Sequence, residues 1–302
     1  MLELFKKPIH DYTDPASFAI PYYFILIAIE LYISTKQKME LYAKKDTWAN
    51  LILAFGTGIL GTIGIAVFYA LFTFLYQYRL FTIPATWWSW ILIVFVDDFN
   101  YYWYHRWHHE IRIFWAAHIN HHSSQKLNFS TALRQPWTVA LYYKAFWFWL
   151  PLIGFQPWMV MTMMSINLIY QYWTHTTLIG KLGFLEWFMN TPSHHRVHHA
   201  SNIKYLDKNH AGIFIIWDRM FGTFQEEEEN PVYGLTSNIN TFNPVHIVFH
   251  EYGSIWKDAR KAKSFTELMK YIFYPPGWSP DGSTKTSKQL QQEMALKNLS
   301  QV

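Results

Sequence analysis

The histidines of this 302-residue chain are concentrated in two short windows and repeat at one spacing. Ten of the fifteen lie within residues 105–122 or 194–199. Three triplets have the form H-x-x-H-H, and they begin at His105, His118 and His195. Residues three and four apart lie on one face of an α-helix, so each triplet directs two or three imidazoles at a common point. Such a point suits a metal ion, whereas solvated or core histidines would have to produce the same spacing three times by chance.

The number and type of these residues set the number of metal ions. Eight to ten imidazoles exceed what one zinc ion needs, since structural zinc takes about four ligands and catalytic zinc about three plus water. We therefore expect two metal ions. Imidazole suits zinc, copper, iron and nickel alike, so the ligands do not choose among them. The chain has no cysteine, which excludes thiolate-bound haem, iron–sulfur clusters and disulfides.

Carboxylates flank the first triplet. Asp97, Asp98 and Glu110 could bind metal, orient a ligand histidine or hold a cofactor. Ionisable residues within a membrane segment are functional by default, so we expect Asp98 to act in catalysis. The alternative is simple ion pairing with Arg106 or Arg112.

The composition is typical of a membrane protein. Hydrophobic residues make up 51% of the chain and charged residues only 15%, against roughly 25% charged in soluble domains. About 20 apolar residues span a bilayer. Five segments approach that length: 17–33, 49–78, 85–104, 137–155 and 157–175. We therefore predict an all-α, polytopic membrane helical bundle of about five spanning segments with a cytoplasmic histidine-rich helical cap.

The segments divide a single integral-membrane domain, residues 1–302. We assign residues 17–104 to the first three membrane segments, 105–136 to the first two histidine boxes, 137–175 to two further membrane segments, 176–282 to the cap with the third box, and 283–302 to a polar tail. The segment 49–78 is too long to cross a bilayer unless it is tilted or broken, and a break would occur at its glycines.

Charge sets the orientation of this bundle. Four lysines follow the first segment and one arginine follows the second, so the lysine loop is predicted to be cytoplasmic, and the same parity places the histidines there. A re-entrant hairpin over 49–78 would put lysines and histidines on opposite faces. Lys6 and Lys7 precede a polar stretch, which predicts an uncleaved anchor. The net charge of +4 is scattered and gives no reason to expect a nucleic-acid partner.

One glycine motif invites a wrong interpretation. Gly56, Gly58 and Gly61 match G-x-G-x-x-G, but the dinucleotide fingerprint needs a preceding strand and an acidic residue about twenty positions later. Here the motif lies inside an apolar segment. We expect these small residues to serve close helix packing.

Three sequence blocks resemble the membrane fatty acid hydroxylase and sterol desaturase superfamily: D-F-N-Y-Y-W-Y-H-R-W-H-H-E (98–110), W-A-A-H-I-N-H-H-S-S (115–124) and H-R-V-H-H (195–199). Mapped onto the histidine boxes of that superfamily, the first box takes His105 and His109 and leaves His108 as an extra. The resemblance also favours His175 as a ligand. The implied metal ligands are His105, His109, His118, His121, His122, His175, His195, His198 and His199.

The resemblance implies an O₂-dependent lipid oxygenase with two Fe ions, which zinc can replace in purified protein. Further blocks (128–135, 190–199, 207–212, 215–224 and 233–236) resemble the branch that hydroxylates alkylglycerol ether lipids beside the ether oxygen, releasing an aldehyde, with tetrahydrobiopterin as reductant. In that branch Glu110 is expected to matter for activity or pterin binding. His210 stands where the branch usually has an aromatic residue, and the chain is shorter at its N-terminus than eukaryotic members.

Breaking an unactivated C–H bond requires a redox metal with O₂, and no flavin or nicotinamide motif is present, so an external electron donor is expected. A sterol or fatty-acyl hydroxylase or desaturase, supplied by a cytochrome or ferredoxin, is the alternative within the superfamily. A metal transporter is the alternative from another class, but it should place its polar ligands at midmembrane. Here they lie beyond the ends of the apolar segments.

Overall fold

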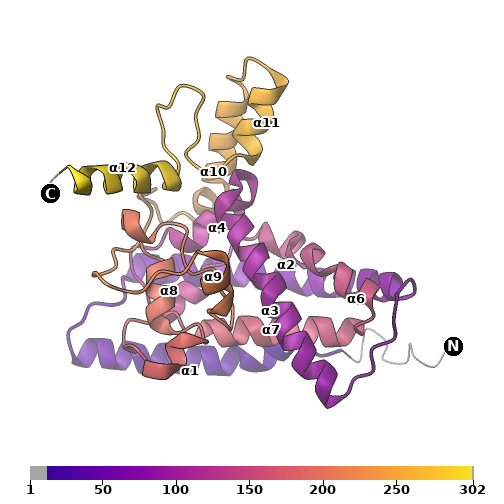
Figure 1. The fold of residues 1–302 in the computed structure, drawn as a ribbon. Helices are drawn as coiled ribbons and strands as arrows, with labels where there is room; N and C mark the ends of the chain where they lie inside the picture. The colour runs from indigo at the N-terminus through magenta and orange to yellow at the C-terminus, as the bar shows by residue number, and fades with distance from the viewer. Residues whose placement is uncertain (1–11, 301–302) are drawn as a thin grey trace.

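The computed structural model describes residues 12–300, which are helical apart from connecting loops and one isolated β-bridge between Ala200 and Tyr233 (Figure 1). Lys6 and Lys7, on which the expectation of an uncleaved anchor rests, lie outside the described residues. The longer helices are α1 (Pro15–Lys36), α2 (Lys44–Tyr76), α3 (Trp87–Glu110), α4 (Arg112–His122), α7 (Pro157–Tyr172), α10 (Pro244–Ala259), α11 (Phe265–Phe273) and α12 (Ser287–Leu299). The short helices are α5 (Phe129–Ala132), η3 (Val139–Leu141), η4 (Tyr143–Trp147), α6 (Trp149–Ile153), η5 (Gly183–Trp187), α8 (Pro192–His198), η6 (Ile203–Tyr205) and α9 (Ile216–Phe221).

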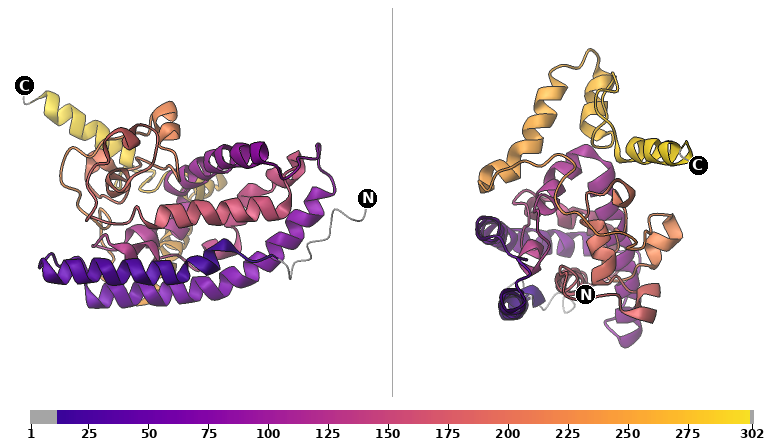
Figure 2. Two further views of the ribbon diagram at one scale, coloured as in Figure 1. Left: turned by 90° about the horizontal axis from the view of Figure 1, so that it is seen from below. Right: turned by 90° about the vertical axis from the view of Figure 1, so that its left-hand side faces the viewer.

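Helices α1 and α2 run in opposite directions along one side of the molecule (Figure 2). Both are long and apolar enough to cross a membrane, by length and composition. Large apolar side chains cover their outer faces, as Phe18 (75% exposed) and Phe55 (72% exposed) illustrate. Soluble proteins rarely expose large apolar surfaces to water. The outer faces of α1 and α2 are therefore suited to contact with lipid.

Of the two alternatives for the long second segment, tilt or break, the structure excludes the break. Helix α2 is continuous through Gly56–Gly64 for 33 residues, and at 1.5 Å per residue it is about 50 Å long. A helix of that length can only fit a bilayer core of about 30 Å when tilted or extended beyond it. Because α2 is one helix, the re-entrant hairpin over this segment is also excluded.

The glycines of α2 have two different environments. A Cβ on Gly64 would lie 2.9 Å from the Ala140 carbonyl oxygen, and one on Gly56 would overlap the Trp137 ring. Gly58 and Gly61 have no atom within 4 Å of such a Cβ. Close packing therefore explains Gly56 and Gly64 but not the two glycines between them.

Residues 137–155, predicted as a membrane segment, do not form one helix. They fold into η3, η4 and α6, none longer than five residues. Their apolar side chains pack against protein: Trp147 and Leu150 are fully buried, and the Trp147 indole donates a hydrogen bond to Asp97 at 2.7 Å. The apolar composition of this stretch thus reflects a protein core, which hydropathy does not distinguish from lipid contact. Helix α3 covers most of the predicted segment 85–104, and helix α7 covers most of the predicted segment 157–175.

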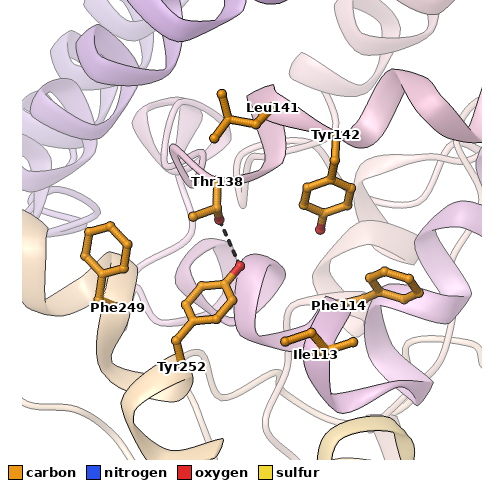
Figure 3. A pocket seen from close by; sticks show the side chains of 7 residues that line it. All are labelled: Ile113, Phe114, Thr138, Leu141, Tyr142, Phe249 and Tyr252. Atoms are coloured by element: carbon orange, nitrogen blue, oxygen red, sulfur yellow. Dashed lines mark hydrogen bonds between the residues drawn. The ribbon is translucent and has the colours of Figure 1, made fainter. Parts of the chain in front are cut away.

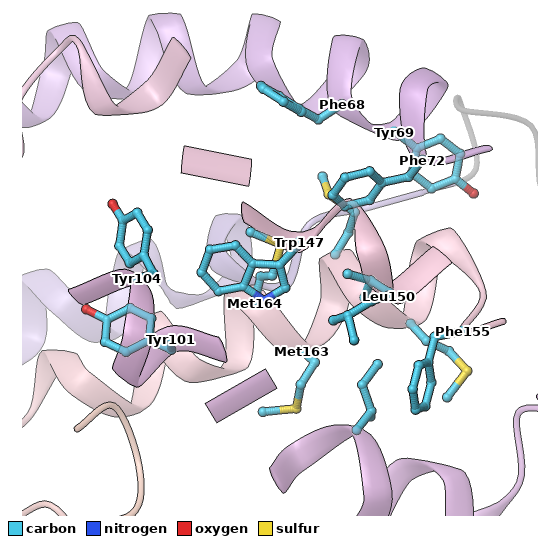
Figure 4. Packing of buried hydrophobic residues seen from close by; sticks show 14 of the residues in the cluster. Phe68, Tyr69, Phe72, Tyr101, Tyr104, Trp147, Leu150, Phe155, Met163 and Met164 are labelled. Atoms are coloured by element: carbon cyan, nitrogen blue, oxygen red, sulfur yellow. The ribbon is translucent and has the colours of Figure 1, made fainter. Parts of the chain in front are cut away.

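The main hydrophobic core lies where α2, α3, α7 and the η4–α6 stretch meet (Figure 4). Phe72 of α2, Trp147 of η4 and Met163 of α7 are among its buried members. Tyr104 of α3 belongs to the same cluster and is one residue before His105. The core therefore fixes the part of α3 that carries the first histidine box.

Candidate metal centre

Four parts of the chain bring the histidine boxes together (Figure 1). The last turns of α3 carry the first box and the last turn of α4 carries the second. Between them Ile111 is extended (φ −119°, ψ 117°), which interrupts the helix and lets the two boxes face each other. The third box lies on α8, which begins with a proline at its first turn. His175 follows the end of α7.

The nine histidines predicted as ligands form two buried groups. Within each group, one ring nitrogen per residue lies within 4.8 Å of all the others. The five-histidine group contains His105, His109, His118, His122 and His198. The four-histidine group contains His121, His175, His195 and His199. Two sites, as expected from the number of imidazoles, are therefore geometrically available.

The second and third boxes are each divided between the two groups. In each triplet the first and last histidines share a group, and the middle one joins the other: His118 and His122 are separated from His121. At 3.6 residues per turn, positions i and i+4 lie about 40° apart around the helix, whereas i+3 lies about 100° from i+4. The sequence predicted that two or three imidazoles of each triplet converge. The structure confirms convergence for two of the three, the first and the last.

The spacing of the ring nitrogens fits metal coordination. The Nε2 atoms of His105 and His118 are 2.9 Å apart, and those of His118 and His122 are 3.2 Å apart. In the other group the Nε2 of His175 lies 2.9 Å from that of His195. Two nitrogens bound at about 2.0–2.1 Å to one ion lie about 2.9–3.4 Å apart. The donor set is all imidazole, which suits iron or zinc.

Hydrogen bonds at the outer ring nitrogens fix which nitrogen faces inward. The Nδ1 atoms of His105, His175 and His198 each contact a backbone carbonyl, at 2.8, 2.9 and 3.0 Å. A carbonyl only accepts, so Nδ1 carries the proton and Nε2 offers its lone pair. This arrangement is typical of metal-binding histidine.

Burial keeps these imidazoles in their ligating form. It lowers the pKa of His198 to about 4, and it lowers the pKa of His118 and His122 well below 6.5, with neighbouring histidines as the second cause. Metal binding requires neutral imidazole. The sites can therefore bind an ion at neutral pH without displacing protons from most of their ligands.

The two acidic residues predicted to act in catalysis bond elsewhere. Asp98 accepts hydrogen bonds from the backbone N–H of Ile213 (2.6 Å) and Phe214 (2.9 Å) and from the Trp217 indole (2.9 Å). It therefore anchors the segment leading into α9. Glu110 pairs with Arg106 at 2.8 Å, which is the ion pairing considered as the alternative. Among the described residues, neither carboxylate has a hydrogen bond to the nine histidines.

Three further histidines lie near the groups. His108 uses both ring nitrogens, on the Tyr104 carbonyl and the Tyr142 hydroxyl, so it remains outside both groups. His194 lies 3.9 Å from Glu186. His210 has its ring 4.9 Å from that of His109, and its Nδ1 is buried without a hydrogen-bond partner.

An apolar cavity of about 380 Å³ lies between α4, η3 and α10 (Figure 3). Phe114, Leu141 and Phe249 form much of its wall, and Tyr252 donates a hydrogen bond to Thr138 across it. Tyr142 lines it too and bonds to His108, whose ring is 6.0 Å from that of His118. The cavity is thus separated from the five-histidine group by His108.

A second cavity, of about 440 Å³, reaches the five-histidine group directly. His109, His122 and His198 line it. The rest of its wall mixes charged and aromatic side chains, such as Asp207 and Trp278. A small molecule with polar groups could approach the metal centre from this side.

Residues 90–223 match the family model described as fatty acid hydroxylase. The chain is 41% identical over 283 residues to "Alkylglycerol monooxygenase" of Homo sapiens and 39% identical over 278 residues to that of Xenopus tropicalis, in each case covering 91% of this chain. It is 45% identical over 194 residues to the protein of that name from Danio rerio, covering 64% of this chain and 43% of that protein. The chain spans 62% of the length of the human and frog proteins. No solved structure gives a significant match.

Proposed function

The chain carries a fatty acid hydroxylase domain, and on this basis we propose that it is a membrane-bound, di-iron, O₂-dependent monooxygenase. Its proposed substrate is an alkylglycerol ether lipid, hydroxylated next to the ether oxygen with release of an aldehyde. The observation that carries the proposal is the pair of buried all-histidine groups inside that domain. The similarity to alkylglycerol monooxygenases supports the choice of substrate.

The nine histidines would hold two iron ions, and zinc can replace iron in such a nitrogen site. Bound iron would supply the redox chemistry with O₂ that amino-acid side chains lack. The protein itself fixes the imidazole tautomers through backbone carbonyls and buries the groups away from bulk water.

The apolar cavity suits the alkyl chain of the substrate. Its volume lies within the range of ligand pockets, and its wall offers almost only aromatic and aliphatic side chains. The mixed cavity beside His109 suits the polar glycerol or a small reductant. Tetrahydrobiopterin or another external donor, including a separate electron-transfer protein, would provide electrons.

Glu110 remains our proposed cofactor residue on the basis of the family resemblance. Burial raises the pKa of Asp207, which lines the mixed cavity, to about 6, and the charge of Glu110 adds to this effect. The variant Glu110→Gln removes the carboxylate charge. It should raise KM for tetrahydropterin more than KM for the lipid. Asp98 we propose to support catalysis by holding the segment before α9.

The membrane arrangement is proposed from contacts at one end of the α1–α2 pair. The Asn128 side chain, shortly after the second box, donates to the Leu41 carbonyl at 2.8 Å, and Arg134 lies 3.3 Å from Asp46. The lysine-rich loop and the histidine groups thus occupy the same end. We propose a multi-pass protein in which α1 and α2 cross, α3, residues 137–155 and α7 pack beside them, and residues 176–282 form a cytoplasmic cap.

The absence of native cysteine makes this topology directly testable. Single-cysteine variants Glu40→Cys and Glu228→Cys in sealed vesicles should be labelled by an impermeant reagent from the same face. Labelling from opposite faces would contradict the arrangement.

The activity is tested by oxygen consumption of iron-reconstituted protein in detergent with an alkylglycerol. Tetrahydropterin is compared with a ferredoxin or cytochrome donor, and aldehyde is followed by mass spectrometry. We expect lipid-dependent oxygen uptake with pterin alone, and aldehyde as product. Uptake only with a protein donor, or with a sterol or fatty-acyl lipid, would instead assign the chain to another branch of the superfamily.

A further inference from the structure

One short loop contacts three of the five histidines in the larger group. His105 Nδ1 donates to the His210 carbonyl at 2.8 Å, and His198 Nδ1 donates to the Lys208 carbonyl at 3.0 Å. His109 Nδ1 lies 3.4 Å from the Asp207 carboxylate. Residues 207–210, here called the clamp loop, thus orient ligands from both the first and the third box.

The clamp loop is held in a conformation that needs support. Asp207 (φ 53°) and Asn209 (φ 56°) both have left-handed backbone angles, which are uncommon outside glycine. The fully buried Asn209 side chain donates to the carbonyls of His194 (3.1 Å) and Gln225 (2.8 Å). Asp218 accepts from the backbone N–H groups of His210 and Ala211, both at 2.8 Å. These bonds fix the loop, and through it the three imidazoles.

The four-histidine group has no comparable support. The Nδ1 atoms of His121 and His195 are buried without a hydrogen-bond partner, and His175 bonds to Gln171, at the end of its own helix α7. Among the described residues, none of the four has a hydrogen bond to the clamp loop. The two groups therefore differ in how firmly their ligands are oriented before an ion binds.

We propose that the clamp loop is a positioning element specific to the five-histidine centre, and that this centre consequently binds its ion more tightly and fills first. The inference rests on the proposed two-metal function. Groups that orient a ligand histidine contribute typically 10–100-fold to metal affinity, because the ligand loses less freedom on binding and becomes more basic.

The test is a titration of the metal-free protein with Co²⁺ under anaerobic conditions, followed by calorimetry and by the cobalt absorption bands. The wild-type protein should bind two ions in two steps. His122→Ala, which leaves four imidazoles in the five-histidine group, should weaken the tighter step, and His121→Ala, which leaves three in the four-histidine group, should weaken or remove the weaker one.

The decisive variant is Asp207→Ala. It should weaken the tighter step by about 10- to 100-fold and leave the weaker step in place. Asp207→Asn, which keeps an oxygen acceptor and nearly the same shape, should weaken the same step less, and it also serves if the alanine variant does not fold. Glu293→Ala removes an exposed carboxylate that pairs with Lys285 on the surface and has no bond to the histidines, and should leave both steps unchanged.

Equal weakening of both steps by Asp207→Ala, or of neither, would overturn the role of the clamp loop. A wild-type protein that binds only one ion would overturn the two-metal proposal and this inference with it. Failure to oxidise an alkylglycerol leads to a different conclusion, since it would change the substrate without affecting the order of cobalt binding.

Discussion

At the residue scale, the division of the site depends on the middle histidine of the second and third triplets, which are His121 and His198. His121 and His122 are neighbours in the chain yet belong to different groups. Similarly, His195 and His198 are both in the third box but in different groups. The second and third boxes therefore each contribute to both groups, and the two centres cannot be assigned to separate segments of the chain.

Substitution of adjacent histidines should therefore remove different ions. We expect His121→Ala, which leaves three imidazoles in its group, to lower the bound metal from two ions per chain towards one, and His122→Ala, which leaves four, to weaken binding at the other group. Both should abolish turnover, because each deletes a donor. Metal analysis of the purified protein measures this. His246→Ala, an exposed histidine on α10, is the control and should retain both ions. Unchanged metal content in His121→Ala, together with unchanged metal affinity in His122→Ala, would refute the ligand assignment.

The buried histidines also make the stability of the metal-free protein depend on pH. Burial lowers the pKa of His198 to about 4, so below pH 6.5 the folded state binds fewer protons than the unfolded state. The free energy of unfolding should then fall as pH decreases from about 6.5 towards 4, by about 1 kcal/mol for each such histidine at pH 5.5. Asp218, whose pKa burial raises to about 6, acts in the opposite direction but is outnumbered.

The measurement is thermal unfolding of the metal-free protein in detergent at pH 7.5 and 5.5. We expect a lower Tm at pH 5.5, with a smaller difference in His198→Gln, which cannot take up that proton. An unchanged Tm across this range would show that the histidines are accessible to protons in the folded state.

At the element scale, apolar composition alone does not determine what a segment contacts. Helix α2 and residues 137–155 are both apolar, yet α2 exposes Phe55 and Ile63 whereas Trp147 is buried. The difference arises because the short helices η4 and α6 fill the space between α2, α3 and α7. The glycines of α2 are consistent with this packing. A Cβ would be crowded only at the glycines that face residues 137–140.

Two glycines on α2 should respond differently to the same substitution. Gly64→Leu should lower Tm, because its Cβ would lie 2.9 Å from a backbone oxygen and force α2 away from η3. Overpacking of this kind costs about 1–3 kcal/mol. Gly61→Leu meets no atom within 4 Å and should be neutral or slightly stabilising. Thermal unfolding in detergent compares the two, and equal losses would contradict the packing.

At the scale of the whole molecule, the C-terminal helices α10, α11 and α12, here called the C-terminal layer, lie beyond α4 at the end of the molecule opposite α1 (Figure 1). Arg112, the first residue of α4, ties this layer to the site through Glu251 (2.8 Å) and Asp258 (2.9 Å) of α10. All three residues line the mixed cavity. These ion pairs therefore stabilise the layer and also shape the mixed cavity that leads to the five-histidine group.

Breaking this connection should loosen the layer without removing a ligand. We expect Arg112→Ala to destabilise the protein by up to about 3 kcal/mol, the low end for a buried ion pair because Asp258 is partly exposed. Lys261→Ala removes an exposed partner of the same Asp258 and should have no measurable effect. Limited proteolysis within residues 234–290 and thermal unfolding measure the change. A stable, protease-resistant Arg112→Ala would show that the layer is held by other contacts.

The sequence by itself predicted most of the candidate metal ligands. The spacing of the boxes depends only on helix periodicity, so it identified eight of the nine histidines that the structure brings together, and the number of imidazoles predicted two groups. The family resemblance added His175, which lies in no box, and set His108 aside. The all-helical class followed from the same local signals, because runs of apolar residues and helical spacing act over a few turns.

Only the tertiary structure decided how those histidines are divided, why residues 137–155 are not one helix, and which residues orient the ligands. The clamp loop lies about a hundred positions from the first box, and its main contributions are backbone carbonyls, which every residue possesses and no sequence pattern marks. Asp98 and Glu110 were conspicuous as charges in an apolar region, yet their partners depend on which segments fold against α3. Helical periodicity is local, whereas these partners are fixed by long-range packing.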